Sequence, residues 1–341
     1  MTGLDPTIGV VVIGRNEGER LRRCLISLGP QASACVYVDS GSVDDSVAFA
    51  RGMGAHVVEL DLTRPFTAAR ARNEGAAALA RAGRHVEFVQ FVDGDCEIEA
   101  GWLQRAAAAL RADAGLAVAF GLRRERARDA SVWNRLCDLE WNVPPGEVLS
   151  CGGDALMRRA AFDAVGGFDP ARIAGEEPEL CLRLRARGWR ILCLDAPMTV
   201  HDAAITRVGQ WWRRTQRGGY VDAEGVAEHG FRYPRWRAVP SAIVWALALP
   251  LAVVATVAAA LAGGAGWLAA AALAGGASLY GLLWARVARR AGQRWSAADA
   301  RTYATWMLLA KWPCLHGMAT WCWRRARGGD RRLIEYKGPA G

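Results

Sequence analysis

Short apolar runs alternate with segments of helical spacing along the N-terminal part of the chain. The apolar runs are rich in β-branched residues, as buried strands are, and lie at residues 8–13, 35–38, 56–60 and 86–92. The segments between them predict helices at residues 16–28, 42–53 and 66–82. This alternation predicts an α/β fold, with a mostly parallel, Rossmann-like sheet and helices on both of its faces.

The ends of the predicted strands point to where a ligand would bind. Gly14, Arg15, Asn16 and Glu17 follow the first strand, in place of a G-x-G-x-x-G loop, which disfavours the common dinucleotide-binding fold. Ligands of parallel sheets bind beyond the carboxyl ends of the strands. Asp39 and Asp93 end the second and fourth strands, so both are candidate site residues.

The pattern changes near residue 239. Residues 239–263 contain no charged side chain, and neither do residues 267–284. Each run is about 20 residues long, which lets a helix span roughly 30 Å of hydrocarbon. A short glycine-rich connection, residues 264–266, joins the runs, so we expect two transmembrane helices that form a hairpin within residues 239–286. A pair of buried core helices is the alternative.

Arginine side chains flank the hairpin and predict its orientation. They are Arg207, Arg213, Arg214, Arg217, Arg232, Arg235 and Arg237 before it, and Arg286, Arg289, Arg290 and Arg294 after it. Positively charged flanks tend to stay in the cytoplasm. We therefore expect a multi-pass protein of the cytoplasmic (inner) membrane, with the soluble part in the cytoplasm.

A third apolar stretch, residues 303–323, differs from the first two. It contains Lys311, Pro313 and His316, and a basic tail follows it. A full crossing would place that tail outside, against the positive-inside tendency. We therefore predict an interfacial or re-entrant helix and a cytoplasmic basic tail within residues 287–341, although a third crossing is not excluded.

Composition and charge narrow the class of protein. The chain has 341 residues, of which 52% are hydrophobic and 23% charged, so it is not intrinsically disordered. The net charge of +9 suggests an anionic partner, such as a phosphorylated substrate, a membrane face or nucleic acid. The nine cysteines form no C-x-x-C pair, which argues against a zinc site or a disulfide framework.

Carboxylates supply the strongest local motifs. Asp93, Gly94 and Asp95 form a turn at the end of a strand, where two carboxylates could hold Mg²⁺ or Mn²⁺ together with a substrate phosphate. A D-G-D triplet also occurs in ordinary turns. Asp39 could accept hydrogen bonds from a base or a ribose hydroxyl, or it could belong to a turn with Ser42.

Further charged and glycine-rich segments follow. Arg72, in the third predicted helix, could pair with a phosphate or simply lie on an exposed face. Gly153 allows close approach of the backbone, and Asp154 could face an acceptor or end a turn. Glu176 and Glu177 begin a helix, where acids compensate the dipole or supply a general base.

Two more segments carry candidate residues. His201 precedes an aspartate and follows a predicted strand at residues 190–194. It would be a metal ligand if Asp95 holds a cation nearby, and a structural residue otherwise. Trp212 and Arg213 lie just before the hairpin and suggest a membrane-surface helix or a nucleotide- or lipid-binding segment. Gly153, Asp154, Trp212 and Arg213 are our candidates for acceptor binding.

Taken in order, these motifs resemble the family-2 glycosyltransferases of the GT-A fold, over residues 8 to about 220. The segments that carry the resemblance are Asn16–Glu17, 38–42, 71–73, 93–95, 152–154, 166–168 and 175–180. The resemblance implies that Asp39 binds the nucleotide base, with Glu17 and Arg72 beside it. It also implies that Asp93 contacts the ribose or the metal.

The same resemblance implies a metal site and a catalytic base. Asp95 would hold Mg²⁺ or Mn²⁺ through the diphosphate, and His201 resembles a late histidine that some GT-A enzymes add to the metal shell. Glu176 and Glu177 stand where the family usually has Glu–Asp. Glu177 would be the base, one methylene longer than usual, and Glu176 is the alternative.

The function that follows is metal-dependent, inverting transfer of a sugar from a nucleotide-sugar donor, which we expect to be a UDP-sugar, to a hydroxyl acceptor. Residues 1–205 would form the catalytic domain and residues 206–238 an amphipathic interfacial linker. The membrane hairpin makes a polyprenyl- or lipid-linked acceptor of cell-envelope or exopolysaccharide synthesis attractive. Two spans are fewer than a polymer-conducting channel would usually need.

Other classes remain open at this point. A non-catalytic membrane-anchored nucleotide or polysaccharide sensor could use the same fold. A nucleotidyltransferase could use the same carboxylate-held metal but would release pyrophosphate. A nucleic-acid-binding protein is disfavoured, because much of the positive charge lies beside the spans and no nucleic-acid-binding motif is present.

Overall fold

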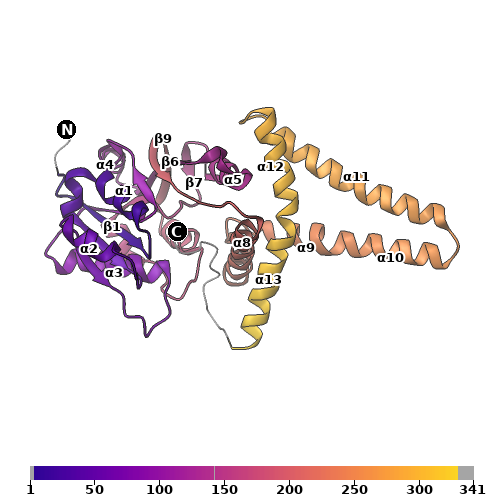
Figure 1. Cartoon of the computed structure of the whole chain (residues 1–341), viewed down its shortest axis with the longest axis horizontal. Helices are drawn as coiled ribbons and strands as arrows, with labels where there is room; N and C mark the ends of the chain where they lie inside the picture. The colour runs from indigo at the N-terminus through magenta and orange to yellow at the C-terminus, as the bar shows by residue number, and fades with distance from the viewer. Residues whose placement is uncertain (1–3, 142, 329–341) are drawn as a thin grey trace. The chain divides into compact units, whose positions relative to one another are not determined.

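A computed structural model describes residues 4–141 and 143–328 of the chain (Figure 1). These residues form two compact units, which divide between Thr206 and Arg207. Each unit is described by itself below.

The first four strands of the first unit are parallel, as the sequence predicts. They are β1 (Ile8–Gly14), β2 (Cys35–Asp39), β3 (His56–Glu59) and β4 (Phe88–Asp93), in the order β3-β2-β1-β4. Gly14 pairs with Asp39, and Ile13 pairs with Asp93. The register therefore brings the ends of β1, β2 and β4 to one edge of the sheet, where the polar motifs begin.

The predicted helices are present, but all three start later than expected. They are α1 (Glu19–Ser27), α2 (Ser46–Gly52) and α3 (Ala68–Arg81). The chain at Asn16 and Gly18 has positive φ angles of 54° and 49°, which cannot continue a right-handed helix. The Asn16 amide also donates to Ser42 Oγ at 2.9 Å, so residues 42–45 form a loop that closes over this turn.

The sheet beyond β4 is mixed, which corrects the mostly parallel sheet expected from the first strands. Its further strands are β5 (Cys96–Ile98), β6 (Leu116–Glu125), β7 (Gly146–Val148), β8 (Ala155–Arg158) and β9 (Arg190–His201). The full order is β3-β2-β1-β4-β8-β6-β9-β5, with β7 also on β9. Strand β8 runs antiparallel to β4 and β6, and β5 and β7 run antiparallel to β9.

Strand β9 is longer than predicted, and this places His201. The strand continues through His201, which pairs with Cys96 of β5, the neighbour of Asp95. The remaining helices of the unit are α4 (Trp102–Ala112), α5 (Val132–Trp141), α6 (Arg159–Ala164) and α7 (Glu176–Ala186). Short 3₁₀ turns occupy Gly29–Ala34 and Arg128–Ala130.

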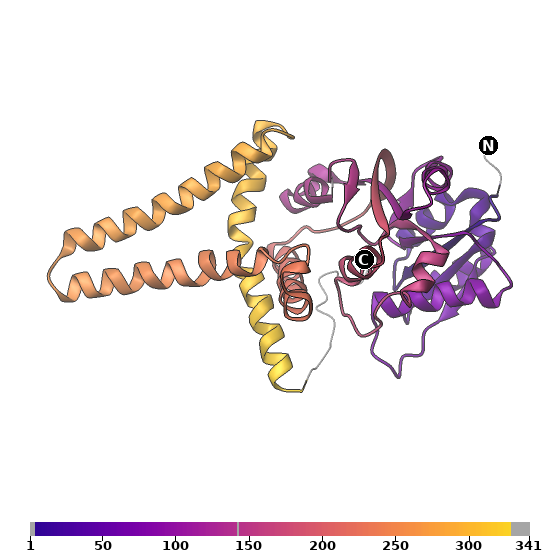
Figure 2. The same ribbon diagram turned by 180° about the vertical axis from the view of Figure 1, so that it is seen from behind.

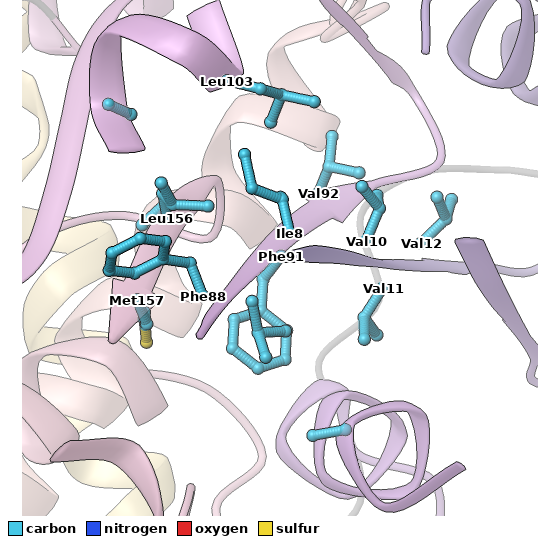
Figure 3. Close-up of a cluster of buried hydrophobic side chains, with 14 of the residues drawn as sticks. Ile8, Val10, Val11, Val12, Phe88, Phe91, Val92, Leu103, Leu156 and Met157 are labelled. Atoms are coloured by element: carbon cyan, nitrogen blue, oxygen red, sulfur yellow. The ribbon is translucent and has the colours of Figure 1, made fainter. Parts of the chain in front are cut away.

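The core lies on both faces of the central strands. Figure 3 shows Val10 and Val12 on one face of β1 and Val11 on the other, and all three are fully buried. Strands buried on both faces read as continuous apolar runs, which explains the sequence pattern. Helix α3 approaches β1 at Gly75, where an added Cβ would lie 2.3 Å from Val11. This close approach sets the height of α3, and hence of Arg72, over the sheet.

The second unit is helical. It contains α8 (Val208–His229), α9 (Ala238–Ile243), α10 (Leu249–Ala262), α11 (Gly266–Ala291), α12 (Ala297–Leu309) and α13 (Lys311–Ala326), with a 3₁₀ turn at Gly230–Arg232 and a π-helical turn at Val244–Ala248. Figures 1 and 2 show α10 and α11 as a long hairpin. Helices α8 and α13 cross closely, because Gly219 faces the backbone of Cys314 and Gly317 faces that of Gln216.

Among the described residues, two helices are long and apolar enough to cross a membrane. They cover Ala238–Ala262 and Gly266–Ala291, with mean hydropathies of 2.3 and 1.5 in their most apolar windows. Only 11% of each window is buried, unlike the core helices that the sequence left as an alternative. The stretch predicted as one helix over residues 303–323 is divided between α12 and α13 at Ala310. Much of the predicted basic tail, from residue 329, lies outside the described residues.

Candidate active site

Three carboxylates surround the buried guanidinium of Arg72 on α3. Its Nη1 donates to Glu176 Oε1 at 2.6 Å and to Glu177 Oε1 at 3.2 Å, and its Nη2 donates to Asp93 Oδ1 at 2.8 Å. Burial alone would lower the pKa of Arg72, but Asp93, Glu177 and Glu176 together raise it, so the guanidinium stays charged. Arg72 of α3 thus connects the end of β4 with the start of α7.

Gly153 lies directly against this cluster. A Cβ added there would meet Arg72 Nη2 at 2.6 Å, Asp93 Oδ2 at 3.0 Å and Glu177 Oε1 at 3.2 Å. Real Cβ atoms do not approach other heavy atoms at 2.6 Å, so only glycine leaves room for the three side chains in this arrangement. Gly152 is different, because its added Cβ would meet nothing closer than Arg123 Nη2 at 4.0 Å.

The two glutamates at the start of α7 differ in their surroundings. Helix α7 begins at Glu176, as the sequence predicts. The side chain of Glu176 is 6% exposed and that of Glu177 is 15% exposed. Burial and the neighbouring Glu176 carboxylate raise the pKa of Glu177 to about 7, against the effect of Arg72. A carboxylate with such a pKa is suited to take a proton near neutral pH.

A second buried cluster lies around Asp95. His201 Nε2 lies 3.4 Å from Asp95 Oδ2, and Asp95, Cys96 and His201 offer ligand atoms that all lie within 4.8 Å of one another. Burial, with Asp154 and Asp95 nearby, raises the pKa of the Cys96 thiol well above its usual range, so this sulfur is a poor ligand. The carboxylate and imidazole donors that remain fit Mn²⁺ or Mg²⁺.

Asp154 lies between these clusters and is completely buried. Its Oδ1 accepts a hydrogen bond from the Asp93 amide at 3.1 Å, and its Oδ2 accepts one from Thr199 Oγ1 at 2.9 Å and pairs with Arg123 Nη2 at 2.7 Å. These contacts connect Asp154 to the backbone of Asp93, and acceptor binding by Asp154 stays a prediction. Gly153, the other nearby candidate for acceptor binding, faces the Arg72 cluster.

Asp39 and Glu17 lie at the same edge of the sheet. Asp39 Oδ1 accepts from Tyr37 Oη at 3.0 Å, and its Oδ2 accepts from the amides of Gly41 and Ser42 at 2.9 and 2.8 Å. These contacts confirm that Asp39 belongs to a turn with Ser42, which is one of the two roles that the sequence allowed. Binding of a nucleotide base by Asp39 stays a prediction. Glu17 covers Gly94, because an added Cβ on Gly94 would lie 3.3 Å from Glu17 Cγ.

Trp212 and Arg213, the remaining acceptor candidates, belong to α8 in the second unit. Trp212 Nε1 donates to His316 Nδ1 of α13 at 3.2 Å, and Arg213 is exposed. They are described only within that unit, so their part in acceptor binding stays a prediction.

Two of the sequence motifs, residues 71–73 and 166–168, are hydrogen-bonded to each other in the structure. Asn73 Nδ2 donates to the Phe168 carbonyl at 2.7 Å, and the Phe168 amide donates to Asn73 Oδ1 at 3.0 Å. The Arg72 guanidinium lies 5.6 Å from the centre of the Phe168 ring. Asn73 therefore fixes the loop around Phe168, whose ring packs beside Arg72.

Sequence reasoning missed three residues around the metal candidates. Arg123 and Glu125 lie on β6, and Trp141 ends α5. The Arg123 guanidinium lies 5.4 Å from the centre of the Trp141 ring, which in turn lies 4.5 Å from that of His201. Each residue stands alone in the sequence. The pairing of β6 with β9 brings Arg123 and Glu125 to the site, and Trp141 reaches it from the end of α5.

Comparisons with known proteins agree with this geometry. Residues 9–166 match the protein family described as "Glycosyl transferase family 2". The chain is 30% identical over 226 residues to a pre-mycofactocin glycosyltransferase of Mycobacterium tuberculosis, in an alignment that covers 61% of this chain and 45% of that protein. The chain thus spans less than half the length of this curated relative.

One solved structure is similar over nearly the whole chain. It is the mannosyltransferase PcManGT of Pyrobaculum calidifontis, determined with GDP-Man and Mn²⁺, which is 22% identical to this chain. The superposition covers 94% of this chain and 89% of that one, with a TM-score of 0.60. At this identity the similarity shows that the fold is shared, and this fold is the GT-A fold.

Proposed function

Because residues 9–166 match glycosyl transferase family 2, we propose that this chain transfers a sugar from a nucleotide-sugar donor to a hydroxyl acceptor, with inversion at the anomeric carbon. The observation that carries the proposal is the cluster of Glu177, Arg72 and Asp93 beside the buried pair Asp95 and His201. It places a carboxylate with a near-neutral pKa next to a candidate metal and phosphate site in one unit.

Glu177 is the proposed general base. Its carboxylate accepts the proton of the acceptor hydroxyl while the hydroxyl oxygen forms a bond to the anomeric carbon. The bond from that carbon to the donor phosphate oxygen breaks, and the electron pair leaves with the nucleoside diphosphate. Arg72 keeps Glu177 oriented and balances part of the charge of Glu176 and Asp93.

Asp95 and His201, with Asp93 beside them, are the proposed ligands of Mn²⁺ or Mg²⁺. When held by these residues, such an ion would supply positive charge against the diphosphate leaving group. The mannosyltransferase PcManGT was determined with Mn²⁺, which supports this choice of ion. Asp39, Glu17 and Arg72 stay our candidates for nucleotide contacts.

A membrane location and a lipid-linked acceptor complete the proposal. The two apolar helices, Ala238–Ala262 and Gly266–Ala291, are the basis for an inner-membrane location. Residues 1–205 would form the catalytic domain at the cytoplasmic face, and residues 206–238 would lead into the membrane. An acceptor that resides in the bilayer would then be held close to the enzyme without diffusing through the cytoplasm.

Paired substitutions at the start of α7 test the proposed base. Glu177→Gln removes the proton acceptor and keeps the shape of the side chain. We expect its kcat for transfer to fall by about 10²- to 10⁴-fold, which is the usual contribution of a general base. Donor affinity, measured by isothermal titration calorimetry, should stay within a few-fold of wild type.

Glu176→Gln is the matched comparison, because it alters the same helix turn and the same arginine. We expect it to lower kcat less than Glu177→Gln. The reverse order, with Glu176→Gln inactive and Glu177→Gln active, would transfer the role of base to Glu176. Full activity of both variants would remove the proposed base from the mechanism.

A further inference from the structure

Glu125 lies behind His201, on the side of the imidazole ring away from Asp95. It is the last residue of β6, and it pairs directly with His201, the last residue of β9. Its side chain is completely buried, and its Oε2 lies 3.6 Å from His201 Nδ1. The two ring nitrogens of His201 therefore face different carboxylates, Nδ1 facing Glu125 and Nε2 facing Asp95.

The partners of Glu125 are all hydrogen-bond donors. The Ala203 amide donates to Oε2 at 3.0 Å, the Ala127 amide donates to Oε1 at 3.2 Å, and Asn134 Nδ2 donates to Oε1 at 3.3 Å. The Asn134 amide group cannot be reversed freely, because its Oδ1 accepts from the Ile205 amide at 3.0 Å. An ionised carboxylate satisfies all of these donors, whereas a protonated acid or an amide would oppose one of them.

This environment has a consequence for the imidazole. Because Glu125 can only accept, the nitrogen that faces it is the one that carries a proton in neutral His201. The other nitrogen, Nε2, then has its lone pair toward Asp95 Oδ2 at 3.4 Å. In neutral His201 these two acceptors repel each other, and a metal cation between them would remove the repulsion.

The ring of Trp141 restricts the imidazole further. It meets His201 edge to face, with ring centres 4.5 Å apart and planes inclined by 74°. Two neighbours outside the candidate ligand set thus face His201, with Trp141 against its ring and Glu125 opposite Nδ1.

We propose that Glu125 is a positioning residue of the metal site, holding His201 with its proton on Nδ1 so that Nε2 directs its lone pair toward a cation that Asp95 also binds. This inference rests on the metal site of the proposed function. It adds a residue that the motifs of the sequence do not mark.

The test measures Mn²⁺ binding to the full chain in detergent, with Mn²⁺ alone and with Mn²⁺ plus UDP or GDP. Electron paramagnetic resonance gives the free Mn²⁺ concentration, and electron spin echo modulation reports the ¹⁴N coupling of a coordinated imidazole. We expect Glu125→Gln to weaken Mn²⁺ binding by about 10- to 100-fold, as loss of a group that orients a metal ligand does. Its ¹⁴N coupling should be lost or weakened.

Glu147→Gln is the control, because Glu147 is an exposed glutamate of β7 that pairs with Arg190. It should bind Mn²⁺ like wild type, with the same ¹⁴N coupling. Wild-type binding and coupling in Glu125→Gln would overturn the inference. If wild type itself binds no Mn²⁺ under any of these conditions, or if His201→Asn leaves the coupling unchanged, the proposed metal site fails first.

A measurement on wild type covers the case in which Glu125→Gln does not fold. The full chain is labelled with ¹⁵N-histidine, and the His201 signals are assigned by their loss in His201→Asn. Two-bond ¹H–¹⁵N correlations at a pH where His201 is neutral then identify the protonated nitrogen. A proton on Nδ1 supports the inference, and a proton on Nε2 overturns it.

Discussion

At the scale of single residues, the carboxyl group of Glu177 is mostly buried and has a pKa near neutral pH. Burial and Glu176 raise that pKa to about 7 from its usual value near 4.5. A base acts in its deprotonated form, so kcat should rise with pH through about 7 and level off above it. Initial rates at saturating donor between pH 5.5 and 9 check this prediction, and a rate that falls as the pH rises through 7 would contradict it.

Gly153 and Gly152 form a matched pair for a second prediction. Gly153→Ala places a Cβ 2.6 Å from Arg72 Nη2 and 3.2 Å from Glu177 Oε1, whereas the nearest atom to a Cβ on Gly152 lies 4.0 Å away. Displacing a catalytic group by a fraction of an ångström is costly, so we expect Gly153→Ala to lower kcat/KM at least about tenfold. Gly152→Ala should stay within a few-fold of wild type in the same assay. Equal activity of the two variants would show that the Arg72 cluster is not needed in this arrangement.

The sequence predicted some of these residues and not others. Arg72, Asp93, Asp95 and Glu177 each belong to a short motif, and the order of the motifs along the chain pointed to a common site. Glu125 belongs to no motif, because it ends an apolar strand and its role arises only from the strand paired with it. Asp154 lies within a motif, but its burial could not be read from the chain.

At the scale of helices and strands, the packing of α8 against α13 depends on glycine. A Cβ on Gly219 would lie 2.1 Å from the Cys314 carbonyl oxygen, whereas a Cβ on its neighbour Gly218 would meet nothing within 4 Å. Overpacking usually costs about 1–3 kcal/mol. Alanine in place of an open helix glycine gains up to about 1 kcal/mol. Gly219→Ala should therefore destabilise the helical unit, and Gly218→Ala should not.

Thermal unfolding followed by circular dichroism at the helix band checks this pair in detergent. The expected order of melting temperatures is Gly219→Ala below wild type, with Gly218→Ala equal to or above wild type. An unchanged melting temperature for Gly219→Ala would mean that α8 and α13 do not cross in this way.

Secondary structure was predictable where the pattern was long and regular. Each of the strands β1 to β4 has an apolar run that can be recognised from the chain alone, and the sequence located all four. Strands β5 and β7 have only three residues each, too few to show a period. The late start of α1 follows from the positive φ of Asn16, which no apolar pattern reveals.

At the scale of the whole molecule, the prediction to test is the membrane topology, that is, which side of the membrane each segment faces. Gly266 lies at the turn of the hairpin, and Cys322 is an exposed native cysteine near the end of α13. A membrane-impermeant maleimide added to intact cells should label Gly266→Cys from outside and should leave Cys322 unlabelled. Labelling of Cys322 from outside would show that residues 303–323 cross the membrane, and Cys322→Ser identifies that signal.

The most direct test of the central claim is donor turnover by the full chain. Detergent-solubilised protein is incubated with UDP-, GDP- and dTDP-sugars and a membrane lipid extract, with Mn²⁺, Mg²⁺ or EDTA, and released nucleoside diphosphate is measured. The account predicts metal-dependent release from one class of donor, lost in Asp95→Ala and kept in the surface variant Glu147→Gln. Binding of a nucleotide sugar without release under any condition would contradict the account and favour a sensor, and release of pyrophosphate from a nucleoside triphosphate would favour a nucleotidyltransferase.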